Sequence, residues 1–270
     1  MTAAHKKKKK RKKKKRPANY WTFREPRNRA IRNLNNTHVL TDFIEKSLRD
    51  LRSALLKSEK QTEQEYVVPS SKGEKTVLSR DREEISGVLE NAYNSGIYEQ
   101  GIIVAVALAE DYLQTTLRTV LQWFPQKLKQ NVAGENVVKS VNLDIILEAK
   151  SKEQLLSRLI NKQMQGVFYG APTRYFEYIE AVLNIDLPAD LKKQFVEVKA
   201  TRDVIVHNSG RANETYLEKA AELARVKNNE KLPVNSEYFS STISHFKRLI
   251  VEFYKQVLAK YGDVEIEDRI

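Results

Sequence analysis

Late in the chain, the six residues from Arg202 to His207 place a permanent cation, a carboxylate and an imidazole on one predicted helix. Arg202 supplies the cation, and His207 supplies the imidazole, a ring that can give or take a proton near neutral pH. Asp203 precedes His207 by four residues, so on a helix the two are neighbours. These three residues form a candidate site.

The residues around this segment predict a helix that turns one face toward a core. Its apolar positions follow helical spacing and are Leu191, Phe195, Val198 and Ile205. Arg202 interrupts that face, and a buried guanidinium is costly unless it is paired. A structural alternative therefore stays open, in which Arg202 pairs with Glu110 or Asp111. In a second alternative, Asp203 and His207 form an ordinary surface pair.

Helical spacing and capping residues elsewhere predict an all-α fold, a helical bundle with a loop and short-helix insertion. We expect helices from Thr37 or Thr41 to Leu55, from Ser79 to a stop at Asn94-Ser95-Gly96, at Ile97–Trp123, from Ser151 through Leu159, at 173–183, from Pro188 to His207 with a stop at Gly210, from Asn213 to Arg225, and at Glu237–Tyr261. The polar segment 61–78 contains a turn and is expected to hold a short hairpin.

Charge divides the chain into three expected parts. The net charge is +12, but residues 6–16 are all Lys or Arg, and without them 36 basic residues balance 35 acidic ones. We expect residues 1–36 to form a disordered polybasic arm, 37–78 an N-terminal helix and polar loop packed on the bundle, and 79–263 the main helical domain. The arm could contact RNA through residues such as Lys6, Arg11 and Arg16. It could equally be a targeting signal or a tag.

Composition removes several classes of function. The absence of Cys excludes disulfides, thiolate nucleophiles and Cys-based zinc sites, and it fits a protein of the reducing cytoplasm. The four His are scattered and no carboxylate–histidine cluster has metal-ligand spacing, so we expect no metal and no cofactor. The longest apolar run, around 102–109, is too short to span a bilayer, so no membrane association is expected.

The candidate segment resembles the R-x4–6-H motif of the HEPN superfamily, the higher eukaryote and prokaryote nucleotide-binding domains. A polar residue follows the Arg, the spacers are apolar, and a small polar turn beginning at Asn208 follows the His. An earlier apolar helix carries Ala109-Glu110-Asp111-Tyr112-Leu113, which is similar to the acidic-aromatic patch of a HEPN core helix. The resemblance covers roughly residues 80–260 and is closest to members of the RiboL-PSP-associated kind.

The resemblance implies a HEPN-like bundle that cleaves RNA without a metal, as a homodimer whose two motifs share one cleft. Arg202, His207 and Asp203 would be the catalytic residues: Arg202 would stabilise phosphoryl charge, His207 would be general base or acid, and Asp203 would orient the His207 ring. Asn208 would donate to a phosphate oxygen, with Glu110 and Asp111 in support. The setting it implies is a toxin–antitoxin or phage-defence system, with an antitoxin as a protein partner. The alternative is an inactive HEPN-like RNA-binding or adaptor protein whose Arg–His motif is structural.

Overall fold

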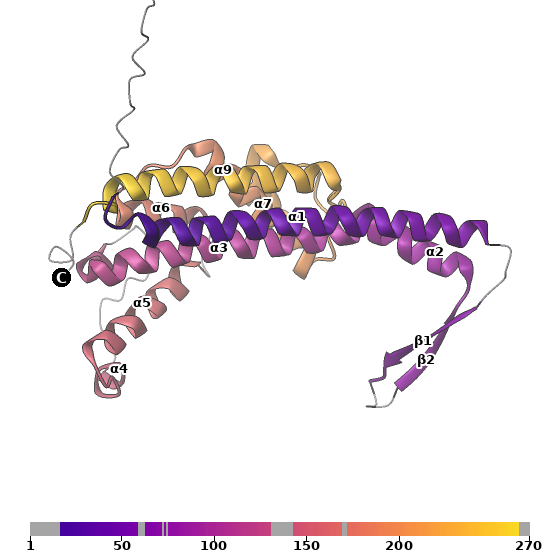
Figure 1. Ribbon diagram of the computed structural model, residues 1–270, viewed down its shortest axis with the longest axis horizontal. Helices are drawn as coiled ribbons and strands as arrows, with labels where there is room; N and C mark the ends of the chain where they lie inside the picture. Colours follow the sequence, from indigo (N-terminus) through magenta and orange to yellow (C-terminus); the bar gives the residue numbers. More distant parts are fainter. Residues whose placement is uncertain are drawn as a thin grey trace, which may run out of the picture.

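The computed structural model describes residues 17–58, 63–71, 73, 75–130, 143–168 and 172–264. These residues form an all-α bundle with one two-stranded hairpin (Figure 1). In chain order the elements are α1 (Tyr20–Lys57), β1 (Gln64–Pro69), β2 (Lys75–Arg80), α2 (Arg82–Asn91), α3 (Ile97–Trp123), α4 (Leu143–Leu147), α5 (Lys152–Phe168), α6 (Pro172–Leu183), α7 (Ala189–His207), α8 (Glu214–Ala220) and α9 (Ser236–Tyr261). None of the described helices is both long and apolar enough to cross a membrane.

Helix α1 begins 17 residues earlier than Thr37, so the expectation of a disordered arm through residue 36 is wrong for residues 17–36. Its buried positions are Phe23, Ala30, Leu34 and Thr41, whose spacing gives one helix face packed on α3 and α9. Pro26 removes one backbone hydrogen bond, and burial of this face offsets that loss. The expected domain boundary between residues 36 and 37 therefore falls inside one continuous helix.

The start of the chain's described part is held against its end. The Asn19 side chain is buried and donates to the carbonyl oxygens of Tyr261 at 3.0 Å and Val264 at 2.8 Å. The Asn19 backbone N–H also donates to the Gly262 carbonyl at 2.8 Å. These contacts make residues 17–19, which directly precede α1, part of the bundle.

Helix α3 is the central helix, and its bounds confirm the sequence expectation. The expected helix stop at Asn94-Ser95-Gly96 is wrong, because a π-helical turn over Ala92–Gly96 joins α2 to α3 without a break. The cap of α2 also differs: Asp81, not Ser79, accepts from the Glu84 N–H in a capping box, while Ser79 lies in β2. A capping box satisfies two backbone donors at the helix end at once, which explains why α2 begins after Asp81.

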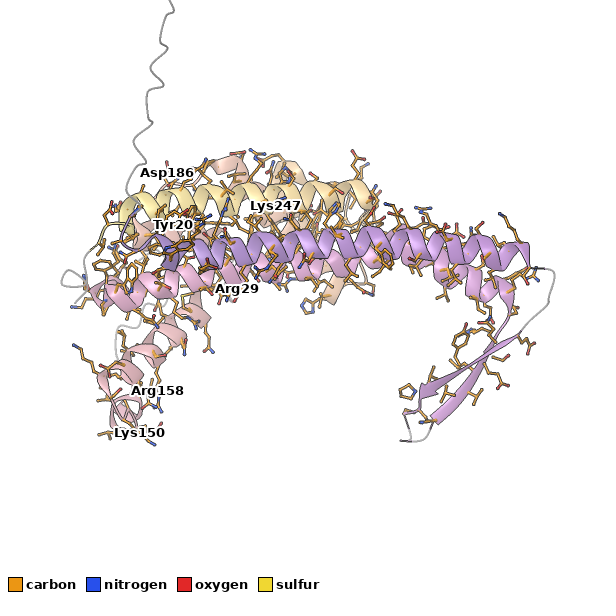
Figure 2. All side chains as sticks on the ribbon, viewed as in Figure 1. Tyr20, Arg29, Lys150, Arg158, Asp186 and Lys247 are labelled. Carbon is orange, nitrogen blue, oxygen red and sulfur yellow. The ribbon has the colours of Figure 1, made fainter. Side chains whose placement is uncertain are left out.

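The expected hairpin is present, with β1 and β2 antiparallel in the register Gln64↔Arg80 to Pro69↔Lys75. In Figure 1 it hangs from the end of the α1–α2 pair, while the arm formed by α4 and α5 projects from the other end on the same side. Figure 2 shows Lys150 and Arg158 on the outer part of that arm. The motif helix α7 lies against α3 between these two projections.

Helix α7 ends where its sequence predicts. The Gly210 N–H donates to the Val204 carbonyl at 3.1 Å, and Ser209 and Gly210 take left-handed φ values of 52° and 74°. This pattern closes the last helical turn and stops the helix at His207. The expected cap of α8 is also confirmed, with the Asn213 side chain accepting from the Tyr216 N–H. On α9 the apolar residues at helical spacing form one seam that is buried throughout: Phe239, Ile243, Phe246, Ile250, Phe253 and Val257.

A buried polar network fixes one face of α7. Glu197 is 5% exposed, and its carboxylate accepts from Thr201 at 2.9 Å, Arg225 Nε at 3.0 Å and the Tyr238 hydroxyl at 2.8 Å. The Arg225 guanidinium also lies 3.6 Å from the Tyr238 ring centre. A fully paired network of this kind holds the loop before α9 and sets the rotation of α7. The opposite face of α7 carries the candidate site.

Candidate active-site pocket

Arg202 and His207 line the same pocket. It is open to solvent, has a volume of about 850 Å³, and is formed by α3, α5, α7 and α8. Its other lining residues are Glu110, Gln114, Arg118, Asn161, Met164, Gln165, Phe168, Lys199, Asp203 and Lys219. This volume falls within the range of roughly 300–1,000 Å³ typical of small-molecule sites. The structure therefore brings Arg202, Asp203, His207 and Glu110 together.

Three helical stripes converge to make this pocket. Residues spaced by three or four positions share a helix face. Helix α3 contributes Glu110, Gln114 and Arg118; α5 contributes Asn161, Met164, Gln165 and Phe168; α7 contributes Lys199, Arg202, Asp203 and His207. Each set follows that spacing, so the regular helices themselves position the site.

An ion-pair chain runs across the α3–α7 wall. Glu110 accepts from Lys199 Nζ at 2.5 Å through one oxygen, and its other oxygen lies 3.6 Å from Arg202 Nη2. Arg202 Nη1 lies 3.0 Å from Asp203 Oδ1. The side chains of Lys199 and Glu110 are only 9% and 14% exposed, and that of Arg202 is 24% exposed. Arg202 is thus half-buried and paired with Glu110, as one structural alternative anticipated, and it still faces the pocket.

The expected hydrogen bond between Asp203 and His207 is not formed. The second oxygen of Asp203 lies 3.5 Å from Lys219 Nζ on α8. With Arg202 on one oxygen and Lys219 on the other, two cations satisfy the carboxylate, and the imidazole of His207 competes poorly with them. The His207 side chain is exposed at the last turn of α7 and has no hydrogen bond or ion pair within the described residues.

Tyr175 is fully buried, and its ring centre lies 6.0 Å from Nζ of the pocket residue Lys199. Burial, reinforced by the negative charges of Glu110 and Asp203, raises the pKa of its hydroxyl well above 10. The phenol therefore stays protonated at neutral pH and cannot act as a general base there. Its hydroxyl has no hydrogen-bond partner among the described residues.

The remaining predicted residues lie elsewhere. Asn208 follows α7 and its amide donates to the Arg211 carbonyl at 2.5 Å, so it stabilises the turn and does not line the pocket. Asp111 is exposed on α3 and does not line the pocket either, which is a correction to its supporting role. Lys6, Arg11 and Arg16 lie outside the described residues.

Sequence reasoning missed Arg118, Lys199 and Lys219, which line the pocket as three further cations. Arg118 could have been found, because it continues the Glu110 stripe by two helical turns along the central helix. Lys219 carried no such signal, since its position depends on how α8 folds back onto α7.

Within the part of the chain that the structure describes, no group of three or more His, Cys, Asp or Glu side chains is arranged to hold a metal ion. Comparison of the chain with protein-family models, with curated proteins and with solved structures finds no match. The resemblance to HEPN proteins therefore rests on the residues quoted above.

Proposed function

We propose that the protein is a metal-independent endoribonuclease of the HEPN type. The observation that carries the proposal is the shared pocket, in which Arg202 and His207 stand beside Arg118, Lys199 and Lys219. The four Lys and Arg side chains, Arg118, Lys199, Arg202 and Lys219, exceed the two carboxylates of the pocket, Glu110 and Asp203, by two positive charges. Such an excess favours a phosphodiester at the place where the imidazole can reach it.

The reaction is an internal transesterification. The 2′-oxygen of a ribose attacks the neighbouring phosphorus while the bond from phosphorus to the 5′-oxygen of the next nucleotide breaks. A base removes the proton of the 2′-hydroxyl and an acid delivers a proton to the leaving 5′-oxygen, which gives a 2′,3′-cyclic phosphate and a 5′-hydroxyl. Imidazole suits both proton transfers near neutral pH.

Arg202 stabilises the negative charge that grows on the phosphoryl oxygens. Its guanidinium has five N–H donors, and Asp203 engages only one end of it at 3.0 Å. The other end lies 3.6 Å from Glu110, a distance longer than a good hydrogen bond. Donors at that end are therefore available to a phosphate, and fixed donors of this kind stabilise developing charge.

The proposal includes a homodimer with a composite site. One imidazole acting alone would have to return to the leaving oxygen the proton that it has just taken. Two copies meeting through a two-fold axis divide the roles of base and acid between two His207 side chains. From the family resemblance we further propose a toxin–antitoxin or phage-defence setting, with RNA as substrate and an antitoxin as partner.

The test is cleavage of end-labelled RNA by the full chain in excess chelator. We expect the wild type to cleave, and Arg202→Ala and His207→Ala to lose cleavage while remaining folded by circular dichroism. Arg248→Ala and His38→Ala are matched controls, because both residues line a different groove formed by α1, α9 and the start of α7. Mixing the two inactive variants is expected to restore part of the activity if Arg and His act from different copies.

A specific observation favours a second candidate. Arg202 is paired with both Asp203 and Glu110, as a structural cation would be. In that case the protein binds RNA or acts as an adaptor without cutting. RNA binding that persists with no cleavage in the wild type would select this function over the nuclease.

A further inference from the structure

The pocket has a second end whose chemistry the proposed reaction does not use. On the α3–α5 side it is lined by Arg118, Gln114 and Gln165 and by Met164 and Phe168, the two apolar residues that we call its floor. Both floor residues are buried, at 2% and 9% exposure. The proposed transesterification needs a cation and an imidazole, so an amide-rich wall over an apolar floor calls for another explanation.

Arg118 differs from the other cations of the pocket. Lys199, Arg202 and Lys219 each lie within 4 Å of a carboxylate. Arg118 has no ion pair among the described residues, and its Nε is buried with no hydrogen-bond partner there. A buried guanidinium donor left unpaired is costly, which favours an anionic ligand at this position.

The spacing separates this end from the candidate catalytic residues. Arg118 follows Glu110 by two helical turns, which places their Cα atoms about 12 Å apart along α3. Glu110 itself contacts Lys199 and Arg202 on α7. A phosphate at Arg202 and a second anion at Arg118 therefore lie at two different places in one pocket.

We propose that this end of the pocket is a nucleotide subsite that holds the unit next to the cleaved bond. Arg118 binds its phosphate, while the amides of Gln114 and Gln165 bind polar edges of its base over the Met164–Phe168 floor. Side-chain amides offer both donors and acceptors, which base edges require. The ligand class is a ribonucleoside 3′-phosphate within a single RNA strand. This inference rests on the proposed function, because the bond next to the subsite is the one that the ribonuclease would cleave.

The experiment measures binding and needs no cleavage. Adenosine, cytidine, guanosine and uridine 3′-monophosphates and inorganic phosphate are titrated into the full chain by calorimetry. At least one nucleotide is expected to bind more tightly than inorganic phosphate. Arg118→Gln is expected to weaken both kinds of probe about ten-fold or more, as loss of a charge-assisted hydrogen bond predicts. Gln165→Ala is expected to weaken the nucleotides and leave inorganic phosphate unchanged.

Lys162→Gln is the matched control, because Lys162 is an exposed cation on α5 that does not line the pocket. Equal weakening by Lys162→Gln and Arg118→Gln would overturn the proposal, since it would show general attraction by positive charge. Nucleotides that bind no more tightly than inorganic phosphate would overturn the base subsite. If Arg118→Gln does not fold, the calorimetric titration of Gln165→Ala, a change at an exposed residue, tests the proposal by itself. Binding as expected without cleavage would refute only the nuclease; cleavage with unaltered binding by the variants would refute only the subsite.

Discussion

Glu110 is predicted to contribute more to stability than either of the cations it contacts. Its carboxylate, 14% exposed, holds Lys199 at 2.5 Å and lies 3.6 Å from Arg202. Glu110→Met would leave the Lys199 ammonium, only 9% exposed, without its carboxylate. Removing one partner of a buried pair costs about 3–5 kcal/mol, and since the pocket admits some solvent we expect about 3 kcal/mol. In a chain of this size that lowers Tm by roughly 6–12 °C.

The reverse change is predicted to be milder. Lys199→Met leaves Glu110 with Arg202 as a remaining partner, so we expect a loss of about 1–2 kcal/mol. The double variant Glu110→Met, Lys199→Met removes both charges together and is expected to be far more stable than the sum of the single losses. Urea denaturation of the four proteins measures the coupling between the two side chains. Additive losses, or a loss below about 1 kcal/mol for Glu110→Met, would refute this account of the wall.

Two further predictions concern packing and pH. Gly101→Ala would place a Cβ 2.7 Å from the ring of Phe239 and is expected to destabilise the bundle by about 1–3 kcal/mol in urea denaturation, whereas Gly87→Ala, with nothing within 4 Å, should stabilise α2 slightly. Burial, with a smaller effect from Arg248, lowers the pKa of His245 below its ordinary 6.5. As the pH falls, the unfolded chain therefore binds a proton at this residue before the folded chain does. The stability contributed by a neutral His245 is complete above about pH 6.5 and is lost as the pH falls through the folded-state pKa. His245→Gln should flatten the stability profile between about pH 7 and pH 5, and an unchanged slope would contradict the assignment.

Features set by local sequence were predicted well. The bounds of α3, the stop of α7 at Gly210 and the buried seam of α9 follow from apolar spacing and from end signals within each segment. The all-α class follows from the same signals. Each of these features requires only residues a few positions apart.

The pairing of Arg202 with Glu110 was anticipated, but other features set by tertiary packing were not predicted. The density of positive charge suggested a disordered arm through residue 36, but Phe23 and Leu34 bury one face of α1 against helices far along the chain. Asp203 was assigned to His207 because the two are close in sequence. Its actual second partner, Lys219, reaches it only after α8 folds back onto α7. Spacing within one helix cannot report such competitors.

The most direct test of the central claim is the RNA-cleavage assay in excess chelator, run on the wild type and on the Arg202→Ala, His207→Ala, Arg248→Ala and His38→Ala variants. The account predicts 2′,3′-cyclic phosphate ends from the wild type and both controls, and from neither pocket variant. Cleavage that survives in Arg202→Ala or His207→Ala, or that disappears equally in Arg248→Ala and His38→Ala, would contradict it.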